Sequence, residues 1–145
     1  MANRVTPIDK EVTFEELGLT NRPVISRTDL KGNITFVNKG FEKLTGYSRE
    51  ELIGQPHSIV RHPDMPKEIF KELWNAIETN GRWRGFIKNL RKDGTYFWTE
   101  VFIEPIFDEN NTKTGYGAVY KPMSEADKEK YSKIYAEMKA KEGGW

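Results

Sequence analysis

The sequence WRGFIKNLRKDGTYFWTEVFIEPI, residues 83–106, decides the fold of this chain. Side chains in residues 83–90 alternate with a period of two, and Asp93-Gly94 in the following five residues is a dipeptide typical of hairpin turns. A longer run with the same strand character then covers residues 96–106. The stretch therefore predicts two long antiparallel strands joined by a tight turn.

Three further strands are predicted on either side of this hairpin. Residues 24–28 and 34–37 are short apolar runs separated by the turn at 29–33. After a turn at 108–114, residues 115–121 form the last strand, which Pro122 ends because proline cannot donate to a strand ladder. We expect a five-stranded antiparallel sheet.

Helices are predicted between the second and third strands. Residues 38–46 and 48–54 form short helices that begin at the capping residues Asn38 and Ser48, and residues 65–79 form a longer amphipathic helix that ends at Asn80-Gly81. A short helical turn at residues 13–17 is also expected. The whole is an α+β fold.

The chain divides into three parts. We expect an N-terminal cap at residues 1–22, one globular domain at 23–122, and an amphipathic C-terminal helix within 123–145. No output segment such as a kinase or a DNA-binding motif follows the globular domain. We therefore expect the output domain on another polypeptide, unless this chain is an excised domain.

Composition excludes several classes of function. The 145 residues carry 23 basic and 22 acidic side chains for a net charge of +1, which gives no footprint for nucleic acid and no basic helix for a lipid surface. No apolar run approaches the ~20 residues of a membrane span, and the N-terminus lacks a signal-peptide core, so we expect a cytoplasmic protein without membrane insertion. The absence of cysteine rules out disulfides, thiolate metal sites and cysteinyl photoadducts.

A rigid polar loop precedes the long helix. Its sequence, RHPDMP at residues 61–66, places a cation, an imidazole and a carboxylate within four residues. The prolines fix φ and disfavour helical geometry at the residues before them. Such a loop is suited to holding a ligand.

The order of the elements resembles that of a PAS domain. Three stretches typical of that family support the resemblance: TDLKGNITFVN at residues 28–38, GYSREELIGQP at 46–56 and RKDGT at 91–95. The loop at 61–66, together with Trp74, Trp83 and Lys88-Asn89, is similar to the flavin-binding PAS domains of bacterial aerotaxis receptors. The resemblance implies a PAS fold with the helices inserted between strands two and three.

The same resemblance implies non-covalent binding of FAD. It assigns cofactor binding, with no catalytic residue and no metal ligand, to Asn38, Arg61, His62, Asp64, Trp74, Trp83 and Asn89. The residues themselves support Asn89 best, because its strand face also carries Trp83, Gly85 and Ile87, and an unpaired buried amide costs ~1–3 kcal/mol. Gly85 leaves room on that face for a flat ring, which Trp83 would border.

Structural interpretations of these residues remain open. Asp64 is also a candidate N-cap of the long helix, and Arg61 and His62 are candidates for pairing with surface carboxylates. Trp74 is suited to a purely structural place in the core. His57 and His62 together are a weak signal for haem or metal ligation.

We expect a redox or energy-taxis sensor, and not an enzyme, that relays the redox state of FAD by conformational change. Expected partners are a chemotaxis-type signalling protein, such as a separate membrane-bound receptor subunit, and a second copy of the chain. The alternatives are a PAS domain without flavin that dimerises or senses haem or a small metabolite, and a small flavoenzyme. The aromatic residues Tyr96, Trp98 and Phe102 on the outer strand face should be covered by the N-terminal cap, the C-terminal helix or a second copy.

Overall fold

The computed structural model describes residues 5–79 and 81–143. Along the chain, the elements are β1 (Ile25–Asp29), β2 (Ile34–Val37), α1 (Lys39–Thr45), α2 (Arg49–Leu52), the 3₁₀ helix η1 (His57–Val60), α3 (Lys67–Thr79), β3 (Trp83–Leu90), β4 (Tyr96–Phe107), β5 (Lys113–Lys121) and α4 (Glu125–Gly143). The predicted helix end at Asn80, residues 1–4 of the predicted cap and residues 144–145 of the C-terminal segment lie outside the described residues.

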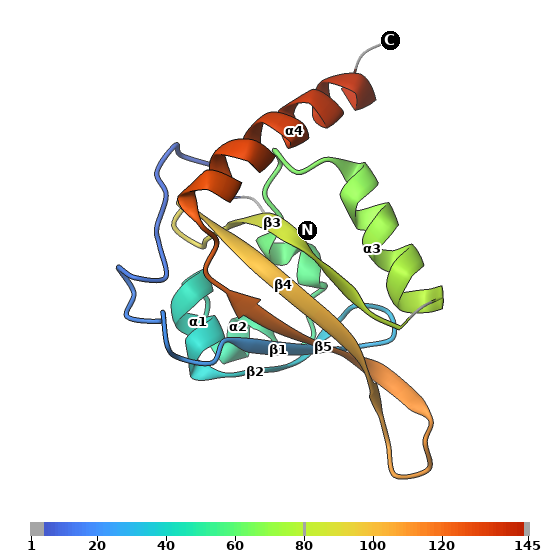
Figure 1. Cartoon of the computed structure of the whole chain (residues 1–145). Coiled ribbons are helices and arrows are strands. Elements are labelled where there is room, and N and C mark those ends of the chain that lie inside the picture. Colours follow the sequence, from blue (N-terminus) through green and yellow to red (C-terminus); the bar gives the residue numbers. More distant parts are fainter. Residues whose placement is uncertain (1–4, 80, 144–145) are drawn as a thin grey trace.

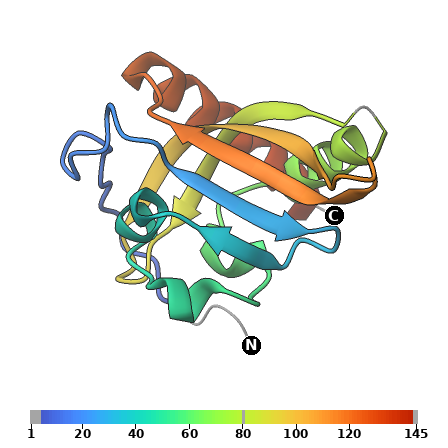
Figure 2. The same cartoon turned by 90° about the horizontal axis from the view of Figure 1, so that it is seen from below.

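The strands form one antiparallel sheet in the order β2-β1-β5-β4-β3, as Figures 1 and 2 show. The five predicted strands are thus confirmed, with bounds that differ by at most two residues. η1 is an element that the sequence did not predict, because one turn of 3₁₀ helix leaves no periodic pattern. In Figure 1 the β4–β5 hairpin projects beyond the other strands.

The register of β3 against β4 fixes the two faces of the sheet. Gly85 lies opposite Val101 and Asn89 lies opposite Phe97, with Gly94 at φ 93° in the turn between the strands. Residues opposite one another in an antiparallel pair share a face. The face of Asn89, Gly85 and Val101 is called the inner face below, and the other is the outer face.

Short helices and α3 lie against the inner face. The side chain of Asn38 caps α1 by accepting from the backbone N–H of Phe41, and Ser48 and Glu51 form the predicted capping box of α2. Helix α3 buries Ile69, Leu73 and Ile77, as its apolar pattern predicted.

Helix α4 covers part of the outer face, as was expected for an aromatic-rich surface. Tyr135 packs against Trp98, with ring centroids 6.0 Å apart, and donates a 2.6 Å hydrogen bond to the carbonyl of Phe86. Tyr131 packs on the Phe86 ring at 4.6 Å. Figure 1 shows α4 on the opposite side of the sheet from α1 and α2.

The N-terminal segment pairs with the start of β4. The backbone N–H of Val12 donates to the carbonyl of Tyr96 at 2.8 Å, and Lys128 of α4 forms a 2.7 Å ion pair with Glu11. Residues 13–17 form a capped turn and not a helix, with Thr13 and Glu16 bonded reciprocally. Gly18 has a left-handed backbone conformation, with φ 70°, and stops the turn from continuing as a helix.

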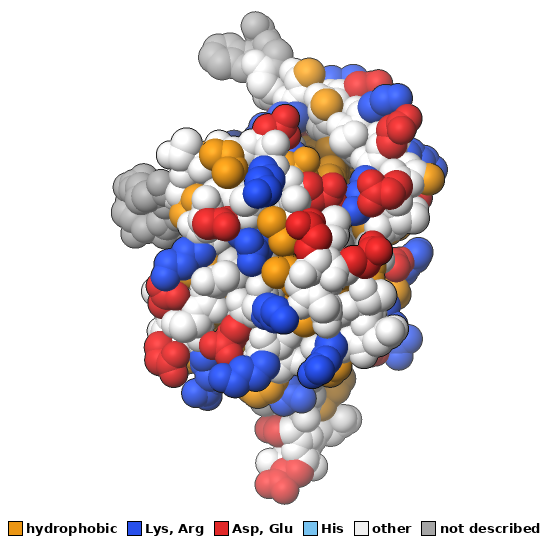
Figure 3. Space-filling model, turned by 90° about the vertical axis from the view of Figure 1, so that its left-hand side faces the viewer, with side chains coloured by type: hydrophobic (Ala, Val, Ile, Leu, Met, Phe, Trp, Pro, Cys, Tyr) orange, Lys and Arg blue, Asp and Glu red, His pale blue; other side chains and the backbone are white. Residues whose placement is uncertain are grey.

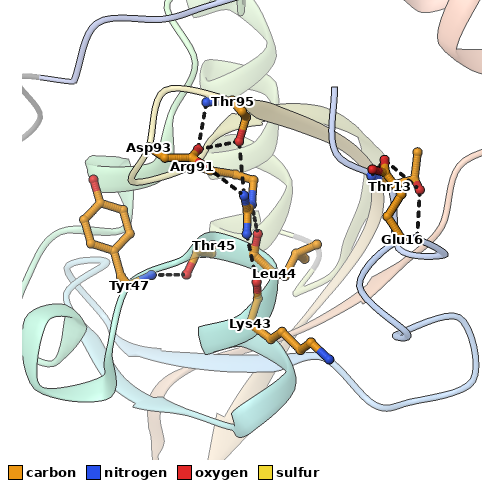
Figure 4. A network of polar contacts seen from close by, with 9 residues as sticks. All are labelled: Thr13, Glu16, Lys43, Leu44, Thr45, Tyr47, Arg91, Asp93 and Thr95. Atoms are coloured by element: carbon orange, nitrogen blue, oxygen red, sulfur yellow. Dashed lines mark hydrogen bonds and ion pairs between the residues drawn. The ribbon is translucent and has the colours of Figure 1, made fainter. Parts of the chain in front are cut away.

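Arg91 joins the β3–β4 turn to the end of α1 (Figure 4). Its Nε donates to the carbonyl of Leu44 at 2.7 Å, and its Nη2 donates to the carbonyl of Lys43 at 3.1 Å. Its Nη1 donates to Thr95 Oγ1 within the turn at 3.1 Å. One side chain therefore holds the hairpin against the helical side of the domain.

The surface carries both signs of charge intermingled, as the face in Figure 3 shows. No helix within residues 5–79 and 81–143 is both long and apolar enough to cross a membrane.

Candidate functional site: a cavity on the inner face

A cavity of about 240 Å³ lies between the inner face of the sheet, α3 and the segment from Pro56 to Arg61. Its lining is mostly apolar and aromatic, with polar groups at a few positions. The lining residues are Ser26, Thr28, Lys31, Gly32, Pro56, His57, Ser58, Arg61, Phe70, Leu73, Trp74, Ile77, Ile87, Asn89, Val101, Ile103, Tyr116, Gly117, Ala118 and Tyr120. This composition is that of a small-molecule site.

Asn89 has the polar side chain in this lining that most needs a hydrogen-bond partner. Its residue is 4% exposed, and its carboxamide makes no hydrogen bond to any residue that the structure describes. Burying an amide without a partner costs roughly 1–3 kcal/mol, so this amide, whose atoms keep access to the cavity, requires a water molecule or a ligand there. The amide offers two donors and a carbonyl acceptor to whatever enters the cavity.

The charges of the lining are of one sign. Lys31 and Arg61 line the cavity, whereas no carboxylate among the described residues does. The Arg61 guanidinium stacks on Phe70, with Cζ 3.8 Å from the ring centroid, and burial lowers its pKa although it stays protonated. Neither cation has an ion-pair partner in the described part of the chain, so the predicted alternative of a surface ion pair for Arg61 is wrong. An anionic group on the ligand would complement them.

The loop at residues 61–66 is fixed to β3 by its backbone and by one ion pair. Arg61 and Asn89 form an isolated antiparallel bridge, and the Asp64 carboxylate accepts from Lys88 Nζ at 2.9 Å. Asp64 is therefore not the N-cap of α3. That place is taken by Glu142 of α4, whose carboxylate oxygens accept from the backbone N–H groups of Lys67 and Glu68 at 3.0 and 2.9 Å.

His62 is buried behind the loop and does not line the cavity. Its Nδ1 accepts from the backbone N–H of Asp64 at 3.0 Å, and its ring meets the edge of Tyr96. Burial, helped by the charge of Lys88, lowers the pKa of His62 to about 4. The Asp64 carboxylate also lies 3.8 Å from His62 Nδ1, so His62 does approach a surface carboxylate, and its ring sets the shape of the loop that presents Arg61.

Two other predicted site residues also lie outside the lining. Asn38 directs its carboxamide to the backbone of the chain, accepting from the N–H groups of Ile25 and Phe41 and donating to the carbonyl of Pro23. Trp83 donates from Nε1 to Glu72 at 3.1 Å, and its ring fills the space above Gly85. The flat ring for which Gly85 leaves room is therefore the indole of Trp83 itself, and Trp83 does not border the cavity.

Trp74 forms a wall of the cavity. It lies against Gly32, where an added Cβ would be 3.0 Å from the indole, and meets Tyr116 edge-on at 5.9 Å. Of the seven predicted site residues, the structure brings together Arg61, Trp74 and Asn89 at the cavity.

A further polar group in the lining was not predicted. Tyr120 Oη lies 2.8 Å from His57 Nε2 and 2.9 Å from Ser26 Oγ, and Ser26 Oγ lies 3.2 Å from the same His57 nitrogen. Strand alternation would have placed Ser26 and Tyr120 on the inner face, but nothing in the sequence brings η1 across to them. Among the described residues, no three metal-ligating side chains form a cluster.

A family model for the PAS fold matches residues 34–120. Over 96 residues the chain is 40% identical to the aerotaxis receptor of Escherichia coli, covering 66% of this chain and 19% of that protein. Over 103 residues it is 40% identical to a blue-light photoreceptor of Listeria innocua, covering 70% of this chain and 41% of that protein. The chain thus spans less than half the length of these two relatives.

Solved structures agree with the family match. A PAS domain from Colwellia psychrerythraea superposes with a TM-score of 0.63 at 39% identity, covering 70% of this chain and 86% of that one. A light-oxygen-voltage domain studied with a flavin analogue superposes with a TM-score of 0.64 at 25% identity, covering 88% and 93%. The resemblance seen in the sequence is confirmed, and the chain belongs to the family of proteins with the PAS fold.

Proposed function

We propose that this chain is a sensor module that binds FAD non-covalently in the inner-face cavity and reports its redox state to a signalling partner. The observation that carries this proposal is the buried, unpartnered carboxamide of Asn89. The edge of a flavin ring offers carbonyl acceptors and an N–H donor, which match the two donors and one acceptor of the amide.

The remainder of the lining fits the same cofactor. Apolar side chains of α3 and the sheet, including Trp74 and Leu73, form walls suited to a planar ring. Lys31 and Arg61 supply positive charge for phosphates without a competing carboxylate. The bound flavin would supply the redox chemistry, since the chain offers no arrangement of acid, base and nucleophile of its own.

His62, Asp64 and Asn38 would support binding from outside the cavity. His62 and Asp64 shape the loop that carries Arg61, and Asn38 holds β1 to the start of α1. Their replacement would weaken flavin binding through position and not through a lost contact. Trp83 would act in the same indirect way, by packing over Gly85.

A signal has a short path from the cavity to the outer face. Asn89 and Arg61 are joined through the backbone, and the neighbouring pair Lys88 and Asp64 lies beside α4, where both line a hollow together with Lys139. A change in the hydrogen bonds of Asn89 would move this loop relative to α4. The output is therefore conformational.

We place this module in the cytoplasm, as a homodimer working with a chemotaxis-type signalling protein that forms a separate, membrane-bound receptor subunit. The similarity to the Escherichia coli aerotaxis receptor supports an energy-taxis role. Because the chain contains no cysteine, it cannot form a cysteinyl adduct with flavin.

An absorbance spectrum of the purified protein tests the proposal. We expect flavin bands, and we expect acid treatment to release FAD, identified by chromatography. A colourless protein that also fails to take up added FAD would instead support a PAS domain that acts by dimerisation. Release of haem or of a different cofactor would likewise contradict the proposal.

Two variants locate the site. Asn89→Ala and Arg61→Ala should each lower flavin occupancy, because one removes the ring contact and the other removes a cation for the phosphates. The exposed residues Asn110 and Arg22 provide matched controls, and Asn110→Ala and Arg22→Ala should keep full occupancy. Full occupancy in both cavity variants would place the flavin elsewhere.

A further inference from the structure

Ser26, His57 and Tyr120 meet at one point of the cavity lining. The shortest of their contacts joins Tyr120 Oη to His57 Nε2 at 2.8 Å, and the two rings are nearly parallel, at 14°. Tyr120 is 4% exposed, and all three residues line the cavity. A phenol hydrogen-bonded to an imidazole nitrogen is a redox-capable group with its proton acceptor already in place.

The surroundings keep this imidazole neutral. Burial, reinforced by the charge of Arg61, lowers the pKa of His57 to about 4, and burial raises the pKa of Tyr120. The charged groups that line the same cavity are Lys31 and Arg61, both cations, and no described carboxylate is among them. In the tautomer with its proton on Nδ1, the neutral His57 ring presents a free lone pair on Nε2 to the phenol.

We propose that Tyr120 donates an electron to a light-excited flavin in this cavity while His57 takes the phenolic proton, which adds a light response to the redox sensor. This inference rests on the proposed binding of flavin. It gives a use to a triad that flavin binding alone leaves unexplained. It also requires no cysteine, which the chain lacks.

The step balances within the cavity. One electron passes from the Tyr120 ring to the excited, oxidised flavin, the Tyr120 O–H bond breaks, and a new N–H bond forms at His57 Nε2. The products are a neutral tyrosyl radical, an imidazolium and a flavin that holds one more electron. Return of the electron and the proton restores the starting state.

Tyr120 is the favoured electron donor because His57 lies beside its hydroxyl and can accept the proton. Tyr116 lies on the same strand and the same face, is 5% exposed and also lines the cavity, but its hydroxyl has no hydrogen-bond partner in the described part of the chain. The Trp74 indole N–H likewise makes no hydrogen bond there. Oxidation of a phenol without a proton acceptor forms a high-energy cation, so coupling to His57 should decide which ring reacts.

The test compares Tyr120→Phe with the matched control Tyr116→Phe in flavin-loaded protein. We expect the flavin emission lifetime to lengthen several-fold in Tyr120→Phe and to stay near the wild-type value in Tyr116→Phe. Illuminated wild-type protein should also give a tyrosyl-radical signal in electron paramagnetic resonance, which Tyr120→Phe abolishes. Equal lifetimes in the wild type and in Tyr120→Phe would overturn the inference, as would a radical that persists in that variant.

Two measurements on unaltered protein guard against misfolded variants. The lifetime in wild-type protein should lengthen in D₂O, because proton transfer to His57 accompanies electron loss. Nitrogen NMR of the flavin-free protein should show His57 protonated on Nδ1 and not on Nε2, and the opposite tautomer would contradict the inference. A protein that binds no flavin overturns both proposals, whereas flavin-loaded protein without these effects overturns only this one.

Discussion

At the scale of single residues, replacing Asn89 should affect flavin binding and protein stability in opposite directions. Because the amide has no partner within the described chain, Asn89→Leu removes a desolvation cost and fills space beside the strand. We expect the free energy of unfolding of the flavin-free protein to stay equal or to rise by about 1 kcal/mol, while flavin occupancy is lost. Urea denaturation measures the first effect and absorbance the second.

The opposite outcome for Asn89→Leu is also informative. A fall in stability of about 2 kcal/mol or more would mean that the amide bonds to the chain itself, and the main support for a cofactor would disappear. Leu90→Ala, next to it on the outer face, is a control in which stability should fall because an apolar side chain that is 2% exposed is truncated.

Arg91 gives a second prediction at this scale. Arg91→Ala removes four hydrogen bonds and leaves the carbonyls of Lys43 and Leu44 without their donor, so we expect a loss of about 2–3 kcal/mol in the free energy of unfolding. Arg91→Lys should recover little, because an ammonium cannot span both carbonyls and the Thr95 hydroxyl. An unchanged urea midpoint in Arg91→Ala would show that the network contributes nothing.

The lowered pKa values of His57 and His62 should make the free energy of unfolding depend on pH. Each has a folded-state pKa of about 4, below the usual histidine pKa of 6.5, so the unfolded chain binds more protons between these values. The histidine contribution to stability should therefore be complete above about pH 6.5, fall as the pH drops towards 4, and level off below 4, where protonation of carboxyl groups with a lowered pKa, such as Asp93 and Glu142, reduces stability further. The slope should approach about 1.4 kcal/mol per pH unit for each histidine.

Replacing either histidine tests whether these two rings cause the loss of stability at low pH. His57→Phe or His62→Phe should remove about half of this slope, as measured by urea denaturation from pH 7 to pH 4. A stability that rises on acidification would contradict the neutral, buried state of both rings.

The sequence could predict those site residues whose position depends on local patterns. It could not predict contacts between residues that are far apart in the chain. Strand alternation placed Asn89 on the buried face correctly, since that needs only the local period. It could not show that Trp83 folds back over Gly85, because rotamers leave no pattern. The contact of His57 with Ser26 and Tyr120 spans 31 and 63 residues, and single-sequence reasoning has no access to such pairs.

At the scale of elements, α4 caps the cavity-lining helix α3. Glu142, near the end of α4, accepts from the first two backbone N–H groups of α3, and these bonds lower the pKa of its carboxyl. We expect Glu142→Ala to raise amide hydrogen exchange several-fold in the first turn of α3 and the last turns of α4. Glu137→Ala, also exposed on α4, is the matched control and should leave both unchanged.

Exchange that is equally slow in Glu142→Ala and in the wild type would show that the two helices are held by other contacts. Such contacts exist closer to the start of α4, where Tyr135 and Lys128 fix it to the sheet and to the N-terminal segment. The sequence predicted an amphipathic C-terminal helix as one candidate cover for the aromatic face of the sheet. It could not predict Glu142 as the cap of α3, since the expected cap, Asp64, is the local candidate.

The elements were more predictable than their contacts. Strands and helices follow from period, caps and turn residues, and these signals agreed along most of the chain. The turn at residues 13–17 and the helix η1 are exceptions. A capping threonine predicts where a helix starts but not that Gly18 ends it, and one turn of 3₁₀ helix leaves no periodic pattern. The strand order β2-β1-β5-β4-β3 was not predicted, because it depends on pairing between strands that are far apart in the sequence.

At the scale of the whole molecule, the outer face is only partly covered. Helix α4 lies over Trp98 and Phe86, but the row formed by Ile25, Val119 and Phe102 across three neighbouring strands lies beside it. Val119, at the centre of this row, is 39% exposed. Arg27 reaches over the exposed ring of Phe36 next to it, at 5.3 Å. This surface is the part of the predicted outer face that is free to meet a second copy.

A charge at the centre of this row tests the proposed homodimer. Val119→Asp should shift the protein from dimer to monomer in sedimentation velocity, because a carboxylate buried between two sheets has no partner and costs several kcal/mol to desolvate. Ile53→Asp is a matched control, since Ile53 is 37% exposed but lies on the helical side of the domain. If Ile53→Asp dissociates the dimer and Val119→Asp does not, the copies meet through the helices, and the signal path through α4 would have to end elsewhere.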